Sequence, residues 1–162
     1  MIPSDHFVRF YNEVFKFLDE QEPGHLEKYW REISRHQELH CLELFRAKGL
    51  PGMYDYWEHI RIEENCDLTL ELSEDRLILT MNRCPSLSKV LDNDAAPCAR
   101  YCEHCPGWIG PLLARSGFFL VYEIGEPDVP TCRLWIFKYR TDAEAKRKQL
   151  AAVNQNIRCN FQ

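Results

Sequence analysis

The stretch that decides the fold is residues 67–81, which read DLTLELSEDRLILTM. Over its first six residues, polar and apolar side chains alternate with the period of two that is typical of a strand with one buried face. Ser73-Glu74-Asp75 predicts a turn, and Leu77, Leu79 and Met81 continue the alternation on a second strand. The stretch therefore predicts an antiparallel hairpin.

A second hairpin is predicted further along the chain. Residues 118–124, FFLVYEI, and residues 132–139, CRLWIFKY, are rich in aromatic and branched side chains, and a loop containing Gly125 separates them. Between the two hairpins lies a segment with four of the eight cysteines, ending in a short helix that Gly117 stops. We expect N-terminal helices packed on a four-stranded antiparallel sheet of two hairpins joined by this Cys-rich helical connector.

Helical periodicity dominates the chain before the first hairpin. Three helices are expected there, at residues 7–18, 25–48 and 54–62. Pro23-Gly24 separates the first two, and Gly49-Leu50-Pro51-Gly52 separates the last two. Helices and strands segregated in this way predict an α+β fold.

We predict a single domain over residues 1–162. Its parts are a helical half at 4–64, a ββαββ half with the Cys-rich connector at 66–139, and a C-terminal helix at 142–153. Thr141 and Glu144 have the spacing of a capping box for that last helix.

Composition narrows the classes of function. The chain is 45% apolar and 28% charged, which is typical of a folded protein rather than a disordered one. A net charge of −5 argues against a nucleic-acid partner, since binding phosphates requires a basic surface. No apolar stretch approaches the ~20 residues of a membrane-spanning helix, and the N-terminus lacks the pattern of a secretory signal. We expect a cytoplasmic protein with no membrane partner, and a homodimer is compatible with the sequence.

The cysteines carry the strongest chemical signal. Cys98, Cys102 and Cys105 have three and two residues between them, and Cys84 lies fourteen positions before Cys98. Such spacing lets neighbouring thiolates converge on one ion while a distant fourth completes a tetrahedron. Four thiolates suit zinc, and they also suit a 4Fe–4S cluster, for which the Cys105-Pro106 pair is a familiar flank. The sequence predicts a metal site of these four cysteines and leaves the choice between zinc and iron–sulfur open.

The fourth ligand and the reactive groups stay open at this point. His104 and Cys132 compete with Cys84 for the fourth position, and Cys132 is also the predicted reactive thiol. Glu123 either faces solvent or points inward, where burial would raise its pKa toward values useful for acid–base catalysis. The remaining cysteines are expected to be buried and structural; they are Cys41, Cys66 and Cys159.

Two further groups of residues are candidates for binding. Arg100, Tyr101 and Trp108 flank the cysteines and are expected to line a small-molecule pocket. Glu32, His36 and His40 are spaced at i, i+4 and i+8, which predicts either a second metal site or, for His40, a hydrogen-bonded histidine in the core.

Several motifs resemble those of a known family. They are Met81-Asn82-Arg83-Cys84, Pro97-Cys98, Gly117 and the run Thr131–Phe137. Over residues 25 to 140, the chain resembles small cysteine-bearing proteins related to L-2-amino-thiazoline-4-carboxylic acid hydrolase and, more distantly, the 4-vinyl-reductase domain, whose fold resembles haem-nitric-oxide-binding domains. The resemblance implies a pocket between sheet and helices, with Cys84, Cys98, Cys105 and Cys132 as functional positions. The chain departs from the family at Cys102-Glu103-His104-Cys105, which favours a cluster over a lone nucleophilic thiol.

These observations together predict a small metal- or iron–sulfur-binding enzyme of hydrolase or lyase type, acting on a small thio- or nitrogen-containing substrate. The alternative is a non-catalytic ligand- or redox-sensing domain with a structural four-cysteine site. A closed site of four thiolates favours the second function, and an open position beside a pocket favours the first.

Overall fold

The computed structural model of the protein describes residues 5–92 and 96–162. Its elements are, in chain order, α1 (Asp5–Asp19), α2 (His25–Gln37), the π-helix η1 (Glu38–Leu42), α3 (Glu43–Glu63), β1 (Asp67–Leu72), β2 (Arg76–Arg83), α4 (Pro85–Leu91), the 3-10 helix η2 (Tyr101–Glu103), α5 (His104–Ser116), β3 (Phe119–Ile124), β4 (Cys132–Phe137), α6 (Arg140–Ala151) and β5 (Ile157–Cys159).

In the described ranges, five strands form one antiparallel sheet in the order β1-β2-β4-β3-β5. Both predicted hairpins are present, and β2 pairs with β4 so that Leu79 lies opposite Leu134. The α+β class is therefore confirmed. The expected four-stranded sheet is wrong by one strand, because β5 adds to the free edge of β3. A strand of three residues is too short to show a periodicity of two in the sequence.

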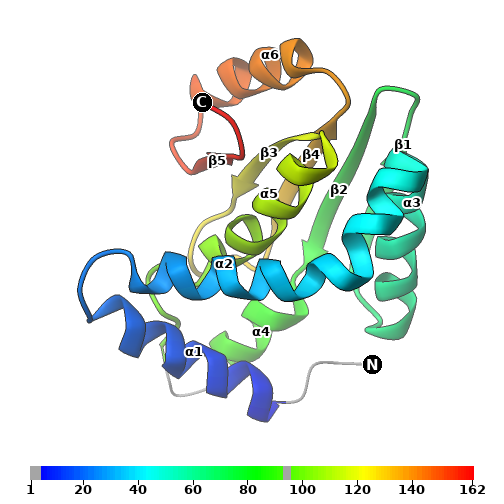
Figure 1. The fold of residues 1–162 in the computed structure, drawn as a ribbon. Coiled ribbons are helices and arrows are strands. Elements are labelled where there is room, and N and C mark those ends of the chain that lie inside the picture. The colour runs from blue at the N-terminus through cyan, green and yellow to red at the C-terminus, as the bar shows by residue number, and fades with distance from the viewer. Residues whose placement is uncertain (1–4, 93–95) are drawn as a thin grey trace.

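Helices cover both faces of the sheet (Figure 1). α3 and α5 lie against one face, and α6 packs on β3 and β4 from the other. Side chains alternate along β3 accordingly: Leu120 and Tyr122 join the core under α3 and α5, while Val121 packs under α6. The same alternation determines which functional side chains lie on one face of the sheet.

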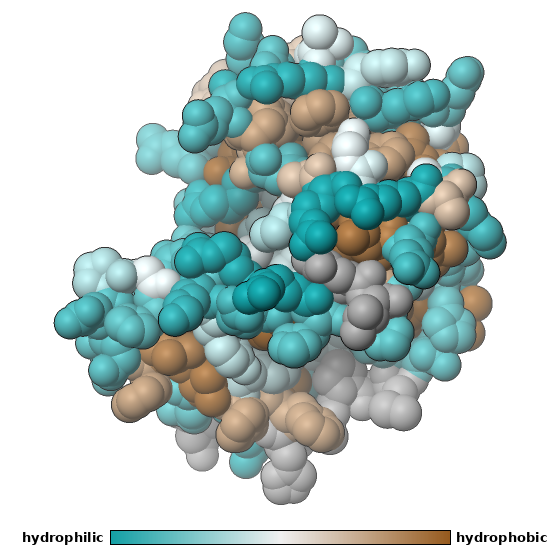
Figure 2. Space-filling view, in the orientation of Figure 1, coloured by the Kyte–Doolittle hydropathy of each residue, from teal (hydrophilic) through white to brown (hydrophobic). Residues whose placement is uncertain are grey.

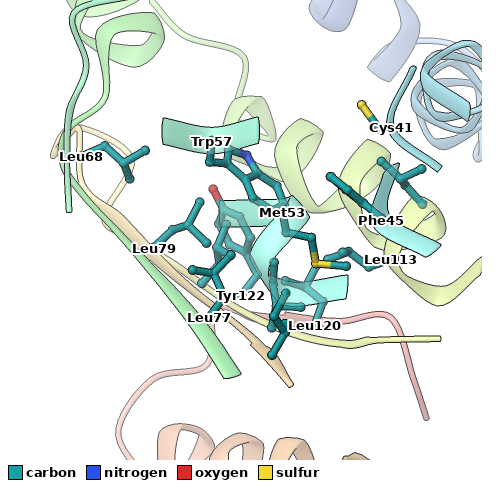
Figure 3. Packing of buried hydrophobic residues seen from close by; sticks show 14 of the residues in the cluster. Cys41, Phe45, Met53, Trp57, Leu68, Leu77, Leu79, Leu113, Leu120 and Tyr122 are labelled. Atoms are coloured by element: carbon teal, nitrogen blue, oxygen red, sulfur yellow. The ribbon is translucent and has the colours of Figure 1, made fainter. Parts of the chain in front are cut away.

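The core between α3, α5 and the sheet holds the largest group of buried apolar residues (Figure 3). Phe45 and Met53 from α3, Leu113 from α5 and Leu77 from β2 are fully buried in it. Burial of each such side chain contributes about 1.5–3 kcal/mol. A second cluster ties α1, α2 and α4 together; it contains Val8, Phe15, Leu26, Trp30, Leu87 and Val90.

The helical half differs from the prediction in its second helix. The expected helix over residues 25–48 is divided by η1. The predicted boundary after it is present, because Gly49 has a non-helical backbone with φ of 59° and ψ of −140°, so that α3 consists of two helical stretches that meet at a kink there. Pro51 is tolerated because it lies in the first turn after the kink, where its missing N–H would have no partner.

Two further helices also differ from expectation. α4 was not predicted; Cys84 is its N-cap, and the Cys84 sulfur accepts a hydrogen bond from the backbone N–H of Leu87. The last helix begins at Arg140 with Tyr139 at its N-cap, so the predicted cap at Thr141 is wrong.

The surface in view in Figure 2 is largely polar, with apolar side chains gathered over α1. Three phenylalanines of that helix, Phe7, Phe10 and Phe17, are 70%, 66% and 62% exposed. α1 thus packs its inner face on the second cluster and leaves aromatic rings outside. None of the helices in the described ranges is both long and apolar enough to cross a bilayer.

Candidate functional site: a pocket lined by thiols

A pocket of about 370 Å³ lies between the sheet, α3, α5 and the start of α4. Much of its wall is apolar, formed by Trp57, Ile60, Leu68, Leu79, Trp108 and Leu134, among others. Figure 3 shows the part of this wall where Trp57 of α3 points toward Tyr122 and Leu79 of the sheet. Four thiols also line the pocket: Cys66, Cys84, Cys105 and Cys132. An apolar wall with a few polar groups is typical of a small-molecule site.

The first two residues of α5, His104 and Cys105, contact each other through their side chains. The sulfur of Cys105 lies 3.3 Å from Nε2 of His104. The other ring nitrogen, Nδ1, is hydrogen-bonded to the backbone oxygen of Tyr101. Because a carbonyl oxygen can only accept, Nδ1 carries the proton. In the neutral ring, Nε2 therefore accepts a hydrogen bond from the Cys105 thiol.

Burial keeps this pair uncharged. His104 is 4% exposed, and the loss of hydration lowers its pKa to about 4. Burial also raises the pKa of the Cys105 thiol well above its usual value, and charge on Cys132 would raise it further. The resting pair is therefore a thiol beside a neutral imidazole, with the imidazole oriented by a third group. This is the arrangement of a nucleophile with its base.

Tyr122 lies between two of the thiols. Its hydroxyl oxygen is 3.1 Å from the sulfur of Cys132. It also hydrogen-bonds Cys105 and lowers the pKa of that thiol. Burial raises the pKa of Cys132 to about 11, so Cys132 is a neutral thiol at physiological pH. One phenol thus links Cys105 of α5 to Cys132 of β4.

Cys102 adds a further thiol to the group. Burial raises its pKa to about 12, and charge on Cys84 or Cys132 would add to that shift. Four cysteines from four segments therefore interact electrostatically; they are Cys84, Cys102, Cys105 and Cys132. Of the predicted metal ligands, Cys84 and Cys105 line the pocket together with Cys132, whereas Cys102 does not line it.

Cys98, the remaining predicted ligand, has different surroundings. It is buried in the cluster of Val8 and Phe15, and its backbone N–H donates to Oδ1 of Asn12. The charged groups that act on its thiol are Asp19, Arg100 and Lys16 rather than other cysteines.

The fit of a metal ion can be judged from the side chains as they lie. In the part of the chain that the structure describes, no three His, Cys, Asp or Glu side chains are close enough to hold one ion. His104, moreover, uses both ring nitrogens on Tyr101 and Cys105. The donor chemistry suits zinc or iron–sulfur, but the arrangement of the thiols does not provide such a site. The metal site stays a prediction.

Glu123 lies on the opposite face of the sheet from Tyr122, because neighbouring residues of a strand point to opposite faces. Its carboxylate accepts a hydrogen bond of 3.2 Å from the side-chain amide of Asn154. Cys132 lines the thiol-lined pocket and Glu123 does not, but both residues line a second cavity of about 440 Å³ at the ends of β3 and β4.

The three predicted ligand-binding residues are divided between environments. Trp108 lines the pocket, with its ring centroid 4.5 Å from that of His104. Tyr101 is buried behind the pocket. Arg100 lies outside it, where its guanidinium is paired with three carboxylates and packs on the ring of Trp30; the carboxylates belong to Asp19, Glu27 and Glu103.

The proposed grouping of Glu32, His36 and His40 is not formed. Glu32 pairs with Arg35 at 3.0 Å, and both histidines are exposed. The expectation of a core histidine at His40 is wrong because η1 inserts an extra residue into a turn and shifts the phase of the helix.

Sequence reasoning missed the polar groups that distant elements bring to the pocket. Tyr11 comes from α1, Glu64 from the end of α3, and Ser86 from α4. Of the residues missed, Tyr122 alone could have been found from the sequence, because strand alternation places it on the same face as Leu120.

Comparisons of the chain with protein-family models, with curated proteins and with solved structures find no match.

Proposed function

We propose that the protein is a thiol-dependent enzyme of hydrolase type that acts on a small, largely apolar substrate in the pocket. Cys105 is the nucleophile and His104 is its base. The observation that carries the proposal is the 3.3 Å contact between the Cys105 sulfur and Nε2 of His104, inside a pocket of about 370 Å³. The resemblance to small cysteine-bearing hydrolases supports a substrate that contains sulfur or nitrogen.

The reaction follows from the protonation states. The Cys105 sulfur forms a bond to the electrophilic carbon of the substrate while its proton passes to Nε2 of His104. The π electron pair of the C=O or C=N group moves onto its heteroatom, then returns as the bond to the leaving group breaks. The leaving group takes the proton from Nε2. Water, deprotonated by the same nitrogen, then cleaves the acyl–sulfur bond and restores the thiol.

Cys105 is favoured over Cys132, the thiol predicted from the sequence, because of their partners. Cys132 contacts the phenol of Tyr122, whose pKa is raised well above its usual value, so the phenol stays protonated and does not accept the Cys132 proton. His104 is neutral at physiological pH because its pKa is about 4, so Nε2 is free to accept a proton. Among the described residues of the pocket, Cys105 thus has the better base.

Acylation by p-nitrophenyl acetate tests the proposal. We expect release of p-nitrophenolate and a single acetyl group on Cys105, located by peptide mass spectrometry. His104→Gln should slow acylation by about 100-fold or more, since base catalysis contributes on that scale. Cys105→Ala should abolish it, and Cys159→Ser, which changes a thiol outside the pocket, should not alter it. Acetyl label on Cys132, or an undiminished rate in Cys105→Ala, would contradict the proposal.

A metal-binding function is a second candidate, favoured by the mutual electrostatic effect of the four thiols. The donor set that these electrostatic effects support includes Cys84 and Cys132 and omits Cys98. Anaerobic purification with metal analysis and an absorbance scan tests it: a brown protein indicates iron–sulfur, and a colourless one with bound zinc indicates zinc. Cys84→Ser should lose the metal and Cys98→Ser should keep it. A metal-free wild-type protein would rule out this second function.

A further inference from the structure

Three hydroxyl groups from distant parts of the chain meet at the wall of the pocket. The Tyr11 hydroxyl oxygen lies 2.6 Å from Oγ of Ser86, and that Oγ lies 2.6 Å from the hydroxyl oxygen of Tyr101. Tyr11 and Ser86 line the pocket. Tyr101, which is 2% exposed, lies behind them.

Counting protons limits the directions of these hydrogen bonds. Two short contacts join three hydroxyls, so one proton of the three is left over. A buried donor without an acceptor costs about 1–3 kcal/mol, whereas a donor at the pocket wall can reach a ligand. Either atom of each contact can donate; when Tyr101 donates to Ser86 and Ser86 donates to Tyr11, the proton of Tyr11 is the one left over.

Tyr11 is a neutral phenol at physiological pH. Its hydrogen bonds to Ser86 and Tyr101 lower its pKa, but burial raises that pKa more strongly. The phenol therefore has a proton that it can donate.

That proton lies beside the reactive thiol. Tyr11 lines the same pocket as Cys105, and charge on Cys105 or Cys84 would raise the pKa of Tyr11, which indicates that the phenol is near both sulfurs. Its ring is also 6.1 Å from the ring of His104, between centroids. The donor and the nucleophile therefore face one ligand.

We propose that the Tyr11 hydroxyl binds an acceptor atom of the ligand, the oxygen or nitrogen double-bonded to the carbon that Cys105 attacks. The inference rests on the proposed function and defines the ligand class: a small molecule whose electrophilic carbon belongs to a C=O or C=N group. As the sulfur–carbon bond forms, the π pair moves onto that heteroatom. The hydrogen bond from Tyr11 then strengthens, because it acts on developing negative charge in a site with little water.

Two reactions at Cys105 distinguish this role from a structural one. p-Nitrophenyl acetate requires charge to develop on a carbonyl oxygen, whereas iodoacetamide alkylates the sulfur by displacing iodide from a saturated carbon. We expect Tyr11→Phe to slow acylation about 100-fold, the scale for loss of one such donor, and to leave alkylation of Cys105 unchanged. Tyr29→Phe is the matched control. It removes a phenol hydroxyl from the same helical cluster but outside the pocket, so acylation should stay close to the wild-type rate.

The outcomes separate the inference from the function on which it rests. Equal loss of acylation and alkylation in Tyr11→Phe would reveal a structural role and overturn the inference. Equal loss of acylation in Tyr11→Phe and Tyr29→Phe would overturn it too, since the effect would then belong to the packing of the helices rather than to a donor in the pocket. If Tyr11→Phe were acylated at the wild-type rate, the inference would be rejected, but the role of Cys105 as the nucleophile would stand. A wild-type protein not acylated at Cys105 would reject the proposed function itself.

Discussion

The hydroxyl oxygen of Tyr122 on β3 lies 3.1 Å from the sulfur of Cys132 on the neighbouring strand β4. Tyr122 pairs with Leu134 in the ladder, so Cys132 is its diagonal neighbour on the same face of the sheet. Since Tyr122 is buried under α3 and α5, the contact holds the thiol in the wall of the pocket. The phenol therefore controls how easily Cys132 ionises.

Removing this hydroxyl should make Cys132 less reactive. The hydrogen bond from Tyr122 lowers the pKa of Cys132, which is nevertheless about 11 because of burial. In Tyr122→Phe that pKa should rise further, so the thiolate fraction and the alkylation rate at Cys132 should fall several-fold at about pH 9. Peptide mass spectrometry after iodoacetamide treatment measures this. Cys66, whose pKa burial also raises to about 11 but whose hydrogen-bond partner is Glu64, provides the internal control. An unchanged rate at Cys132 would contradict the prediction.

Gly107 marks the closest approach of α5 to α2. A Cβ atom added there would lie 2.8 Å from Cε3 of Trp30, a ring already buried between helices. Gly107→Ala should therefore destabilise the fold by about 1–3 kcal/mol through overpacking. Gly110 is the matched control in the same helix: its added Cβ would meet the Asn160 side chain at an ordinary 3.5 Å. Gly110→Ala should be neutral or stabilising by up to about 1 kcal/mol, because alanine favours the helix. Urea unfolding of both variants checks this, and similar losses in the two would refute the packing argument.

Phe45 and Phe7 offer a test of where the stability of the helical half resides. Phe45 is fully buried between α3 and the sheet, whereas Phe7 is 70% exposed on α1. Phe45→Ala should cost about 3–5 kcal/mol by leaving a cavity. Phe7→Ala should change the free energy of unfolding by no more than about 0.5 kcal/mol. Thermal and denaturant unfolding measure both, and a large loss in Phe7→Ala would mean that its ring is covered in solution.

Much of the sheet could be predicted because each hairpin shows the sequence pattern of two strands and a turn. Residues 67–81 alternate on both sides of a polar turn, and such a pattern has one compact solution. The strand β5 has only three residues, and its pairing with β3 depends on α6 returning the chain to that edge. The π-helix η1 likewise leaves no local signature, because tertiary packing selects it.

The sequence predicts which residue types and segments form the candidate site, but not which side chains face one another in it. The spacing of Cys98 and Cys102 predicts that their thiolates converge, yet different charged groups act on the two: Asp19, Arg100 and Lys16 on Cys98, and other cysteines on Cys102. The contact of His104 with Cys105 arises between adjacent residues, where spacing rules for metal ligands do not apply. The pocket also needs Tyr11, which is 94 positions before Cys105 in the chain. Such a contact is a property of the packed fold.

His104 should make the protein less stable in mild acid. Its pKa is about 4 in the folded state, against an ordinary value of 6.5, because burial penalises the charged ring. As pH falls below about 6.5, the unfolded chain binds a proton that the folded protein does not, so the free energy of unfolding decreases until about pH 4. A difference of this size corresponds to roughly 3 kcal/mol. Above pH 6.5 the ring is neutral in both states, and the contribution is constant.

Urea unfolding at a series of pH values measures this dependence. His104→Gln should be less stable at neutral pH, because it weakens the contacts to Tyr101 and Cys105, but its stability should fall less steeply between pH 6.5 and pH 4. His59→Gln is the control, since His59 is exposed and pairs with Glu63 at the surface. Paired carboxylates, such as that of Glu27, also titrate on acidification, and they do so equally in wild type and both variants. The difference between the slopes of wild type and His104→Gln therefore isolates the buried ring, and equal slopes would show that His104 is accessible to protons in the folded state.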